Sequence, residues 1–176
     1  MTQEEKELLL KDLCSRLPYN NCRVFYEYID DLDKKTYGYS LTLNTWCISE
    51  LRANKAIIKP YLRPMSSMTE KEAKELLFVR LASKYGESCA YIKNFIKLIE
   101  VSFQKKPPYM GSISVWFSFE DASQMKEYGQ IEYLGQINDI TLAEIDWLNS
   151  HYFDYRGLIE KGLAIEVTKE NNPYED

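Results

Sequence analysis

The chain reads Ile145-Asp-Trp-Leu-Asn-Ser-His-Tyr-Phe-Asp-Tyr-Arg-Gly-Leu-Ile159 near its C-terminal end. This segment holds the only histidine, His151, and groups it with Trp147, a phenylalanine and two tyrosines. So many large, shape-specific residues in a short segment indicate a tightly packed bend or an organised contact surface. The pattern predicts two short helices with a tight bend between them. The second helix is expected to begin near Asp154 and to end between Gly157 and Gly162.

Three helix starts share one signature, in which a threonine precedes a glutamate by three residues. These capping boxes are Thr2–Glu5, Thr69–Glu72 and Thr141–Glu144. The threonine hydroxyl can accept from the third residue's N–H, and the glutamate can accept from the threonine N–H. Helices are therefore expected over about 2–17, 69–85 and from 141 onward. The first should bury Leu9, Leu10, Leu13, Cys14 and Leu17 on one side, with Asp12 on the polar side.

Residues 21–63 have the composition of β-strands. The run from Cys22 to Ile29 is aromatic and β-branched, a polar turn follows at 30–35, and Tyr39, Leu41 and Leu43 alternate in the next run. Residues 113–119 also alternate, as a strand would. The sequence thus predicts an α+β fold, in which a small antiparallel sheet (about residues 21–63 plus 112–119) packs with four to five α-helices.

Hydrophobic periodicity indicates the remaining elements of the chain. Apolar residues at helical spacing favour a helix over 89–103, with a strand as the alternative toward its end, and residues 120–138 are ambiguous. We expect a single compact domain over 1–167, within which 19–65 is a candidate β-rich subdomain. Residues 168–176 are expected to form a disordered tail.

Charge and cysteine usage exclude several classes of function. The net charge is −5, which disfavours nucleic acid as a partner. Four cysteines (Cys14, Cys22, Cys47, Cys89) lie far apart without a C-x-x-C pair, and with one histidine they predict no metal site. No apolar run is long enough for a membrane span, and no signal peptide is evident. We therefore expect a soluble, cytoplasmic protein that has no membrane association.

Two clusters are the candidate binding residues. The basic connector is Lys59, Tyr61 and Arg63, in a run from Leu51 to Met68 that has no acidic residue. The terminal bend supplies His151, Tyr155 and Arg156. Guanidinium groups beside aromatic rings suit a phosphorylated ligand or an acidic protein partner. A lysine-protected strand edge explains the connector equally well.

Catalysis has weak support in the sequence. No G-x-S-x-G, P-loop or G-x-G-x-x-G pattern occurs, so no cofactor is expected. His151 could act with a cysteine and with Asp146 or Asp154, although packing is the more ordinary role for it. A helix–bend–helix over 141–162 also allows a DNA-binding reading, which Asp154 and Glu160 disfavour.

Three segments together resemble a group of uncharacterised proteins found in phages and integrated elements of gut Bacteroides-type bacteria. They run from Glu5 to Tyr19, from Ile58 to Thr69 and from Asp146 to Ile159. The family pattern has a second histidine where this chain has Tyr152. The resemblance implies a bacterial cytoplasm and a mobile-element accessory protein, and it assigns no catalytic residue.

Non-enzymatic binding is the function that the sequence favours, with a protein or a small phosphorylated ligand as the partner. Two alternatives remain open. One is a phage-encoded inhibitor or nucleotide sponge that acts against host defence. The other is a small hydrolase that uses His151.

Overall fold

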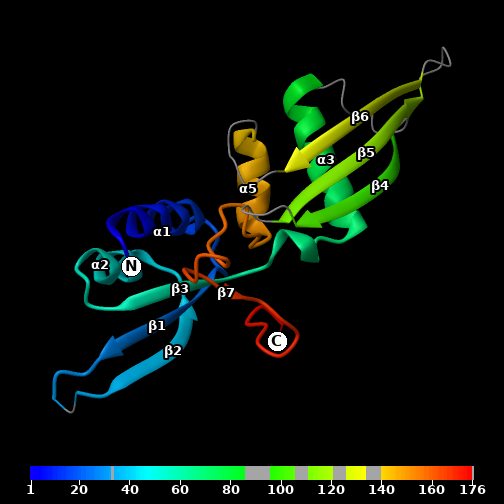
Figure 1. Ribbon diagram of the computed structural model, residues 1–176. Helices are drawn as coiled ribbons and strands as arrows, with labels where there is room; N and C mark the ends of the chain where they lie inside the picture. The colour runs from blue at the N-terminus through cyan, green and yellow to red at the C-terminus, as the bar shows by residue number, and fades with distance from the viewer. Residues whose placement is uncertain (33, 86–95, 106–110, 121–125, 134–139, 176) are drawn as a thin grey trace. The chain divides into compact units, whose positions relative to one another are not determined.

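The computed structural model describes residues 1–32, 34–85, 96–105, 111–120, 126–133 and 140–175 (Figure 1). For the described residues from 84 to 133 it describes only the backbone. The chain divides into two compact units where the sequence predicts one domain. Unit 1 comprises Met1–Arg63, Asn149–Asp154 and Leu158–Asp176. Unit 2 comprises Pro64–Leu148 and Tyr155–Gly157.

Unit 1 begins with helix α1, Gln3–Arg16, whose capping box forms as predicted. The Thr2 N–H donates to the Glu5 carboxylate at 2.6 Å, and the Glu5 N–H donates to the Thr2 hydroxyl at 3.2 Å. The helix buries Leu9 and Leu13, and also the charged pair Asp12 and Arg16. Two expectations are corrected here, because Asp12 is buried and Cys14 is exposed.

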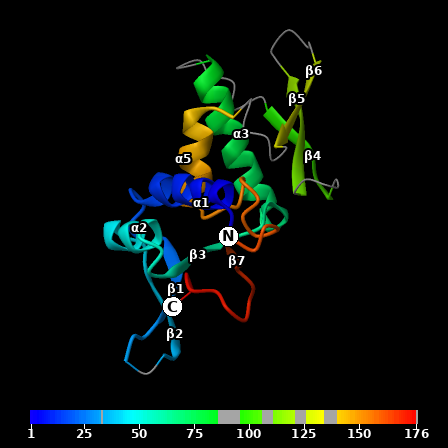
Figure 2. The same cartoon turned by 60° about the vertical axis from the view of Figure 1, so that its left-hand side comes forward.

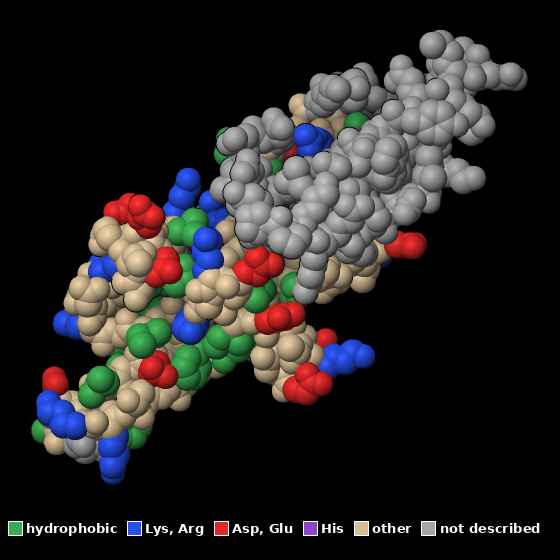
Figure 3. Space-filling model, viewed as in Figure 1, with side chains coloured by type: hydrophobic (Ala, Val, Ile, Leu, Met, Phe, Trp, Pro, Cys, Tyr) green, Lys and Arg blue, Asp and Glu red, His purple; other side chains and the backbone are tan. Residues whose placement is uncertain are grey.

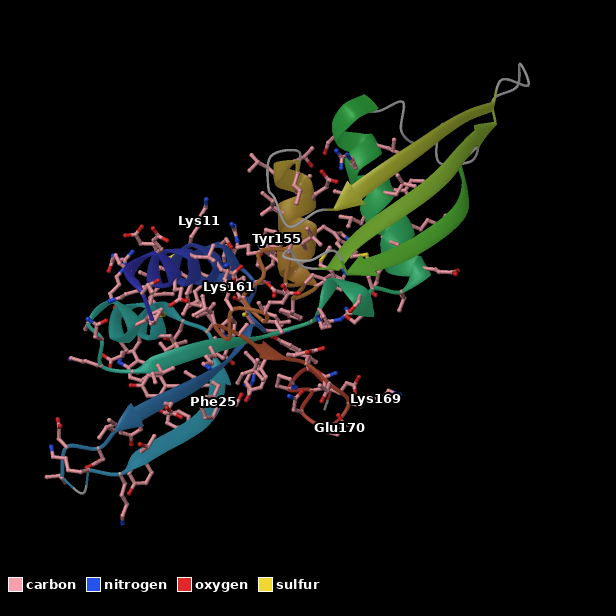
Figure 4. All side chains as sticks on the ribbon, in the orientation of Figure 1. Lys11, Phe25, Tyr155, Lys161, Lys169 and Glu170 are labelled. Atoms are coloured by element: carbon pink, nitrogen blue, oxygen red, sulfur yellow. The ribbon has the colours of Figure 1, made fainter. Side chains whose placement is uncertain are left out.

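Strands β1 (Arg23–Ile29) and β2 (Thr36–Thr42) form an antiparallel hairpin. The turn is closed by the Asp30 N–H, which donates to the Lys35 carbonyl at 2.9 Å. The Asp30 carboxylate accepts from the Leu32 N–H, an arrangement typical of aspartate in turns. On the opposite face from the tyrosines, the Phe25 ring lies over Gly38, where any Cβ would collide with it (Figure 4).

Helix α2 (Thr45–Arg52) follows and is capped by the Asn44 side chain, which accepts from the Cys47 N–H. The sequence predicts strand for these residues, so this part of the expected β region is wrong. Strand β3 (Ile57–Leu62) then pairs with β1 in an antiparallel register and buries alternate residues: Ile58, Pro60 and Leu62. The strand character expected over 21–63 is thus confirmed for Ile57–Leu62.

Strand β7 (Ile165–Glu166) completes the sheet, whose order is β2-β1-β3-β7. It runs parallel to β3, so the sheet is mixed, whereas the sequence predicts an antiparallel one. The core of unit 1 lies between the helices and this sheet. Its buried members are Leu9, Leu13, Cys22, Val24, Tyr26, Leu43, Cys47, Ile48, Leu51, Ile58, Leu62, Leu158, Leu163 and Ala164.

After α5 ends at Ser150, the segment from His151 to Gly162 forms turns and bends, and the predicted second helix is absent from these described residues. Phe153 bridges to Arg63 in a parallel pair, in which the Arg63 N–H donates to the Tyr152 carbonyl at 2.8 Å. The Asp154 carboxylate accepts from the N–H groups of Leu158 and Ile159, so it stabilises a turn and caps no helix. Without a second helix, the helix–bend–helix reading of this region as a DNA-binding motif loses its basis.

The last residues, for which the sequence predicts disorder, are held by hydrogen bonds up to Tyr174. The Asn171 side chain accepts from the Thr168 N–H and donates to the Glu166 carbonyl. The Tyr174 hydroxyl donates to the Tyr61 carbonyl at 2.8 Å and accepts from the Arg23 N–H at 3.2 Å. Its ring stacks on Tyr152, with 4.0 Å between the ring centroids. The tail therefore clamps β1 and β3.

Unit 2 contains the short 3₁₀ helix η1 (Met65–Ser67), helix α3 (Glu70–Tyr85) and most of helix α5 (Leu142–Ser150). A second sheet, of order β4-β5-β6, consists of Ile96–Lys105, Gly111–Glu120 and Lys126–Tyr133. The capping boxes at Thr69 and Thr141 both form. Glu144 also pairs with Arg80 at 3.6 Å.

Two expectations for unit 2 are corrected. Residues 96–103 belong to strand β4, where the sequence favours a helix, and residues 89–95 lie outside the described residues. Strand β5 pairs with β4 and β6 in a sheet of its own, so the predicted strand at 112–119 does not join the N-terminal sheet. The α+β class itself is confirmed, with four α-helices in the described ranges.

Candidate binding surface

The hairpin of unit 1 carries a row of aromatic rings on the face that also bears the core residue Val24. The register places Tyr26 opposite Tyr39 and Tyr28 opposite Tyr37. The ring centroids of these pairs lie 5.5 and 5.9 Å apart. Trp46, near the start of α2, stacks on Tyr26 with 4.9 Å between the centroids. We call Tyr28, Tyr37, Tyr39 and Trp46 the aromatic face.

The rings of this row differ in exposure: Tyr26 is buried, whereas Tyr37, Tyr39 and Trp46 are accessible to a partner. Tyr26 is only 4% exposed, and its hydroxyl donates to the Glu50 carboxylate at 3.2 Å. Burial, assisted by this hydrogen bond, raises the pKa of Tyr26 to about 12, so its hydroxyl stays protonated. Tyr37, Tyr39 and Trp46 are 42%, 47% and 45% exposed. Figure 3 shows hydrophobic side chains at the surface over β1 and β2.

A groove of about 580 Å³ adjoins the aromatic face. Tyr28 and Thr36 line it from the hairpin, and the start of α1 and the turn between α2 and β3 supply the other walls. Its charges are mixed, with Lys6 and Lys55 against Glu27. The Lys6 ammonium is already engaged, since it donates to the Arg52 carbonyl and the Asn54 side chain. The groove is therefore no dedicated anion site.

The basic connector lies on β3 and just beyond it, on alternate residues between the buried ones. Lys59 pairs with Phe25 of β1, and Tyr61 pairs with Ile165 of β7. The Arg63 guanidinium sits over the Phe153 ring, 4.3 Å from its centroid. Arg63 is thus engaged in a cation–π contact within the fold.

The terminal bend is divided between the units. His151 belongs to unit 1, is half-buried, and has its Nδ1 3.1 Å from the Ser150 hydroxyl. Tyr155 and Arg156 belong to unit 2, and the Arg156 guanidinium lies 4.8 Å from the centroid of the Tyr155 ring. Four of the six predicted binding residues therefore lie in unit 1 and two in unit 2.

Sequence reasoning missed the aromatic face, although its signal was present. Tyr26 and Tyr28, and likewise Tyr37 and Tyr39, recur at a spacing of two residues, which places each pair on one face of a strand. Of these residues Tyr28 is half-buried, whereas Tyr37 and Tyr39 are exposed.

Two of the three described cysteines have the properties of packing residues. Cys22 and Cys47 are fully buried in the core of unit 1. Burial raises the pKa of the Cys22 thiol to about 11 and shifts that of Cys47 in the same direction. Because the thiolate is the nucleophile, neither group is activated for cysteine-based catalysis at neutral pH.

These thiols give a direct test of the core of unit 1. We expect the exposed Cys14 to react with iodoacetamide at neutral pH, while Cys22 and Cys47 stay unmodified until the protein is unfolded. Peptide mass spectrometry after timed labelling measures each site separately. Rapid labelling of Cys22 in the folded protein would contradict its placement in the core.

Among the described residues we find neither a metal-binding cluster nor a membrane-spanning helix. No group of three or more His, Cys, Asp or Glu side chains is arranged to hold a metal ion in the part of the chain that the structure describes. Within the same residues, no helix combines the length and apolar character needed to cross a membrane.

Comparison of the chain with models of protein families, with curated proteins and with solved structures finds no significant match.

Proposed function

We propose that this protein is a binding module that recognises a protein partner through the aromatic face of unit 1. The observation that carries the proposal is a set of large rings, about half-exposed, held in place on a hydrogen-bonded hairpin. Tyrosine and tryptophan are enriched at the energetic centres of protein interfaces because they combine apolar area with a polar tip.

Ordering of the rings before binding supports the proposal. Trp46 already stacks on the buried Tyr26, and Tyr28 stacks on Tyr37. A side chain fixed by its neighbours loses little rotamer entropy when a partner covers it, and immobilising a free side chain costs about 0.5–1.5 kcal/mol. The aromatic face would therefore convert more of its buried area into affinity than flexible side chains would.

The biological context is part of the same proposal. The resemblance to proteins of phages and integrated elements suggests an accessory role in a bacterial cytoplasm, with a host or phage protein as the partner. The net charge of −5 fits a protein partner better than it fits nucleic acid.

The experiment compares variants of the aromatic face in a defined binding assay. Partners captured from a bacterial lysate are identified, produced pure and titrated by calorimetry. We expect Tyr37→Ser, Tyr39→Ser and Trp46→Ala, made singly, to weaken binding, the strongest of them by about 30-fold, the effect of a 2 kcal/mol interface residue.

Leu32→Ala is the matched control, because Leu32 is 95% exposed at the tip of the same hairpin and outside the aromatic face. Its affinity should equal that of the parent. Equal binding by the parent and by all three variants would rule out the aromatic face as the binding surface.

A further inference from the structure

Strand β2 is an open edge without the usual protection. Its sequence, Thr36-Tyr-Gly-Tyr-Ser-Leu-Thr42, has no charge and no proline, and Thr36 to Ser40 are all exposed. The pairing with β1 is unbroken from Thr36 to Thr42, so no bulge twists the edge away. Soluble proteins usually block such edges with lysine, proline, bulges or a covering segment.

The sheet's opposite edge is short and continues into hydrogen-bonded turns. Strand β7 has only two residues, and the Thr168–Tyr174 turns follow it. By contrast, β2 is the outermost strand of its sheet, and no described element of unit 1 pairs with its free edge (Figure 2).

The hydrogen bonds at the two ends of the hairpin determine which backbone groups of β2 face outward. The Asp30 N–H donates to the Lys35 carbonyl, and the Leu43 N–H donates to the Cys22 carbonyl. Opposite residues alternate between bonded and non-bonded pairs. Tyr37, Tyr39 and Leu41 therefore bond to β1. The N–H and C=O groups of the even-numbered residues, Thr36, Gly38, Ser40 and Thr42, point to the open edge.

We propose that two copies of the chain pair through β2 in an antiparallel register, with the two-fold axis at Tyr39. This register aligns Thr36 with Thr42, Gly38 with Ser40, and Tyr39 with itself. The bonded pairs are then formed by the outward-facing even residues of both copies, as the alternation requires. Each bonded pair exchanges two backbone hydrogen bonds.

The side chains argue for a second copy as the occupant. On one face, Tyr37 of each copy meets Leu41 of the other, and the two Tyr39 rings adjoin across the axis. On the other face, threonine meets threonine and glycine meets serine. Aromatic, aromatic–aliphatic and Thr–Thr pairs are favourable cross-strand partners. A C2 interface must be self-complementary, and this strand has no charge to repel its own copy.

The residues just beyond the strand are also compatible with self-pairing. In the proposed register, Lys35 of one copy lies opposite Leu43 of the other, and Lys34 lies opposite Asn44. No like charges meet at either end. Two four-stranded sheets would join into one of eight strands, and the two aromatic faces would become one continuous surface.

Light scattering on the full chain tests the proposal. We expect the parent to have twice the mass of one chain and Ser40→Pro to have the mass of one, because proline removes an outward N–H. The bond ladder to β1 does not use that N–H. Ser40→Ala is the matched control and should remain a dimer. A monomeric parent, or a Ser40→Pro variant that is folded by circular dichroism and still dimeric, would overturn the proposal.

A disulfide tests the register without depending on the proline variant. In a non-bonded antiparallel pair the Cα atoms lie about 4.5 Å apart, within the range that a disulfide spans. In a background with Cys14→Ser and Cys89→Ser, Tyr39→Cys should form a covalent dimer under mild oxidation. Ser40→Cys should not, because its partner is Gly38. Equal cross-linking by both variants would contradict the two-fold axis at Tyr39.

The dimer and the proposed binding function are tested by different variants. Ser40→Pro leaves Tyr28, Tyr37, Tyr39 and Trp46 unchanged, whereas the ring variants leave the outward N–H groups unchanged. A folded Ser40→Pro variant that remains a dimer therefore counts against the strand pairing alone, and ring variants that bind the partner as tightly as the parent count against the aromatic face alone.

Discussion

Replacing Arg16 by alanine is expected to lower the free energy of unfolding of unit 1 by about 3–5 kcal/mol, the usual result of removing one partner from a buried ion pair. The Arg16 side chain is fully buried, and its Nε and Nη2 donate to the two Asp12 carboxylate oxygens at 2.7 and 3.1 Å. Nη2 also donates to the Phe153 carbonyl at 2.9 Å. Alanine would leave both acceptors buried without these donors.

Urea unfolding followed by circular dichroism measures the effect. The double variant Asp12→Leu/Arg16→Leu removes both charges and keeps apolar volume, so it should be clearly more stable than Arg16→Ala. Lys11→Ala, at an exposed position of the same helix, should change stability by no more than about 0.5 kcal/mol. A loss below about 1 kcal/mol for Arg16→Ala would indicate a pair that behaves as if it were solvated.

Phe153→Ala should destabilise unit 1 by a similar amount, about 3–5 kcal/mol, because truncating a buried phenylalanine loses its apolar burial and leaves a cavity. Phe153 is fully buried, and its ring lies under the Arg63 guanidinium. The same residue forms the parallel bridge to Arg63 through the backbone. The side chain thus fixes the segment that supplies the carbonyl for Arg16.

Thermal and urea unfolding should report this loss, with Glu160→Ala as an exposed control in the same segment. The control should stay within about 0.5 kcal/mol of the parent. Phe153→Leu should lie between Phe153→Ala and the parent, since it restores part of the volume. If Phe153→Ala matched Glu160→Ala, the segment would not be packed as described.

The sequence predicts most reliably the elements that depend on residues close together in the chain. The three capping boxes form as predicted because each needs only one threonine, one glutamate and a helical turn. The hairpin at 23–42 is confirmed for the same reason, as its branched and aromatic strands flank a polar turn.

Tertiary contacts decided the elements that were predicted wrongly. Residues 45–52 have a mixed composition, and the Asn44 cap, followed by burial of Cys47, Ile48 and Leu51, makes them a helix. Residues 96–103 are β-branched as well as helically spaced, and pairing with β5 makes them a strand. Past Asp154, Gly157 adopts a φ of 77°, which a continuing helix does not allow.

The candidate site depends on which side chains the tertiary fold leaves exposed, and the periodicity of the sequence does not show this. Alternation places Tyr37 and Tyr39 on one face, but it does not give their exposure, which depends on the tertiary packing around the hairpin. Likewise, Asp12 and Arg16 lie at i and i+4 and look like an ordinary surface pair. Their burial is a tertiary effect, in which Arg16 meets the Phe153 carbonyl 137 residues later in the chain.

Unit 1 is assembled from sequence that is widely separated along the chain, and this has a consequence for its synthesis. Residues 1–63 emerge from the ribosome before the residues that complete unit 1, because the Phe153 carbonyl and strand β7 follow only about a hundred residues later. Until then the nascent chain exposes the β3 edge, and Arg16 has yet to meet the Phe153 carbonyl. Chaperone binding to early intermediates should therefore concentrate on this N-terminal portion.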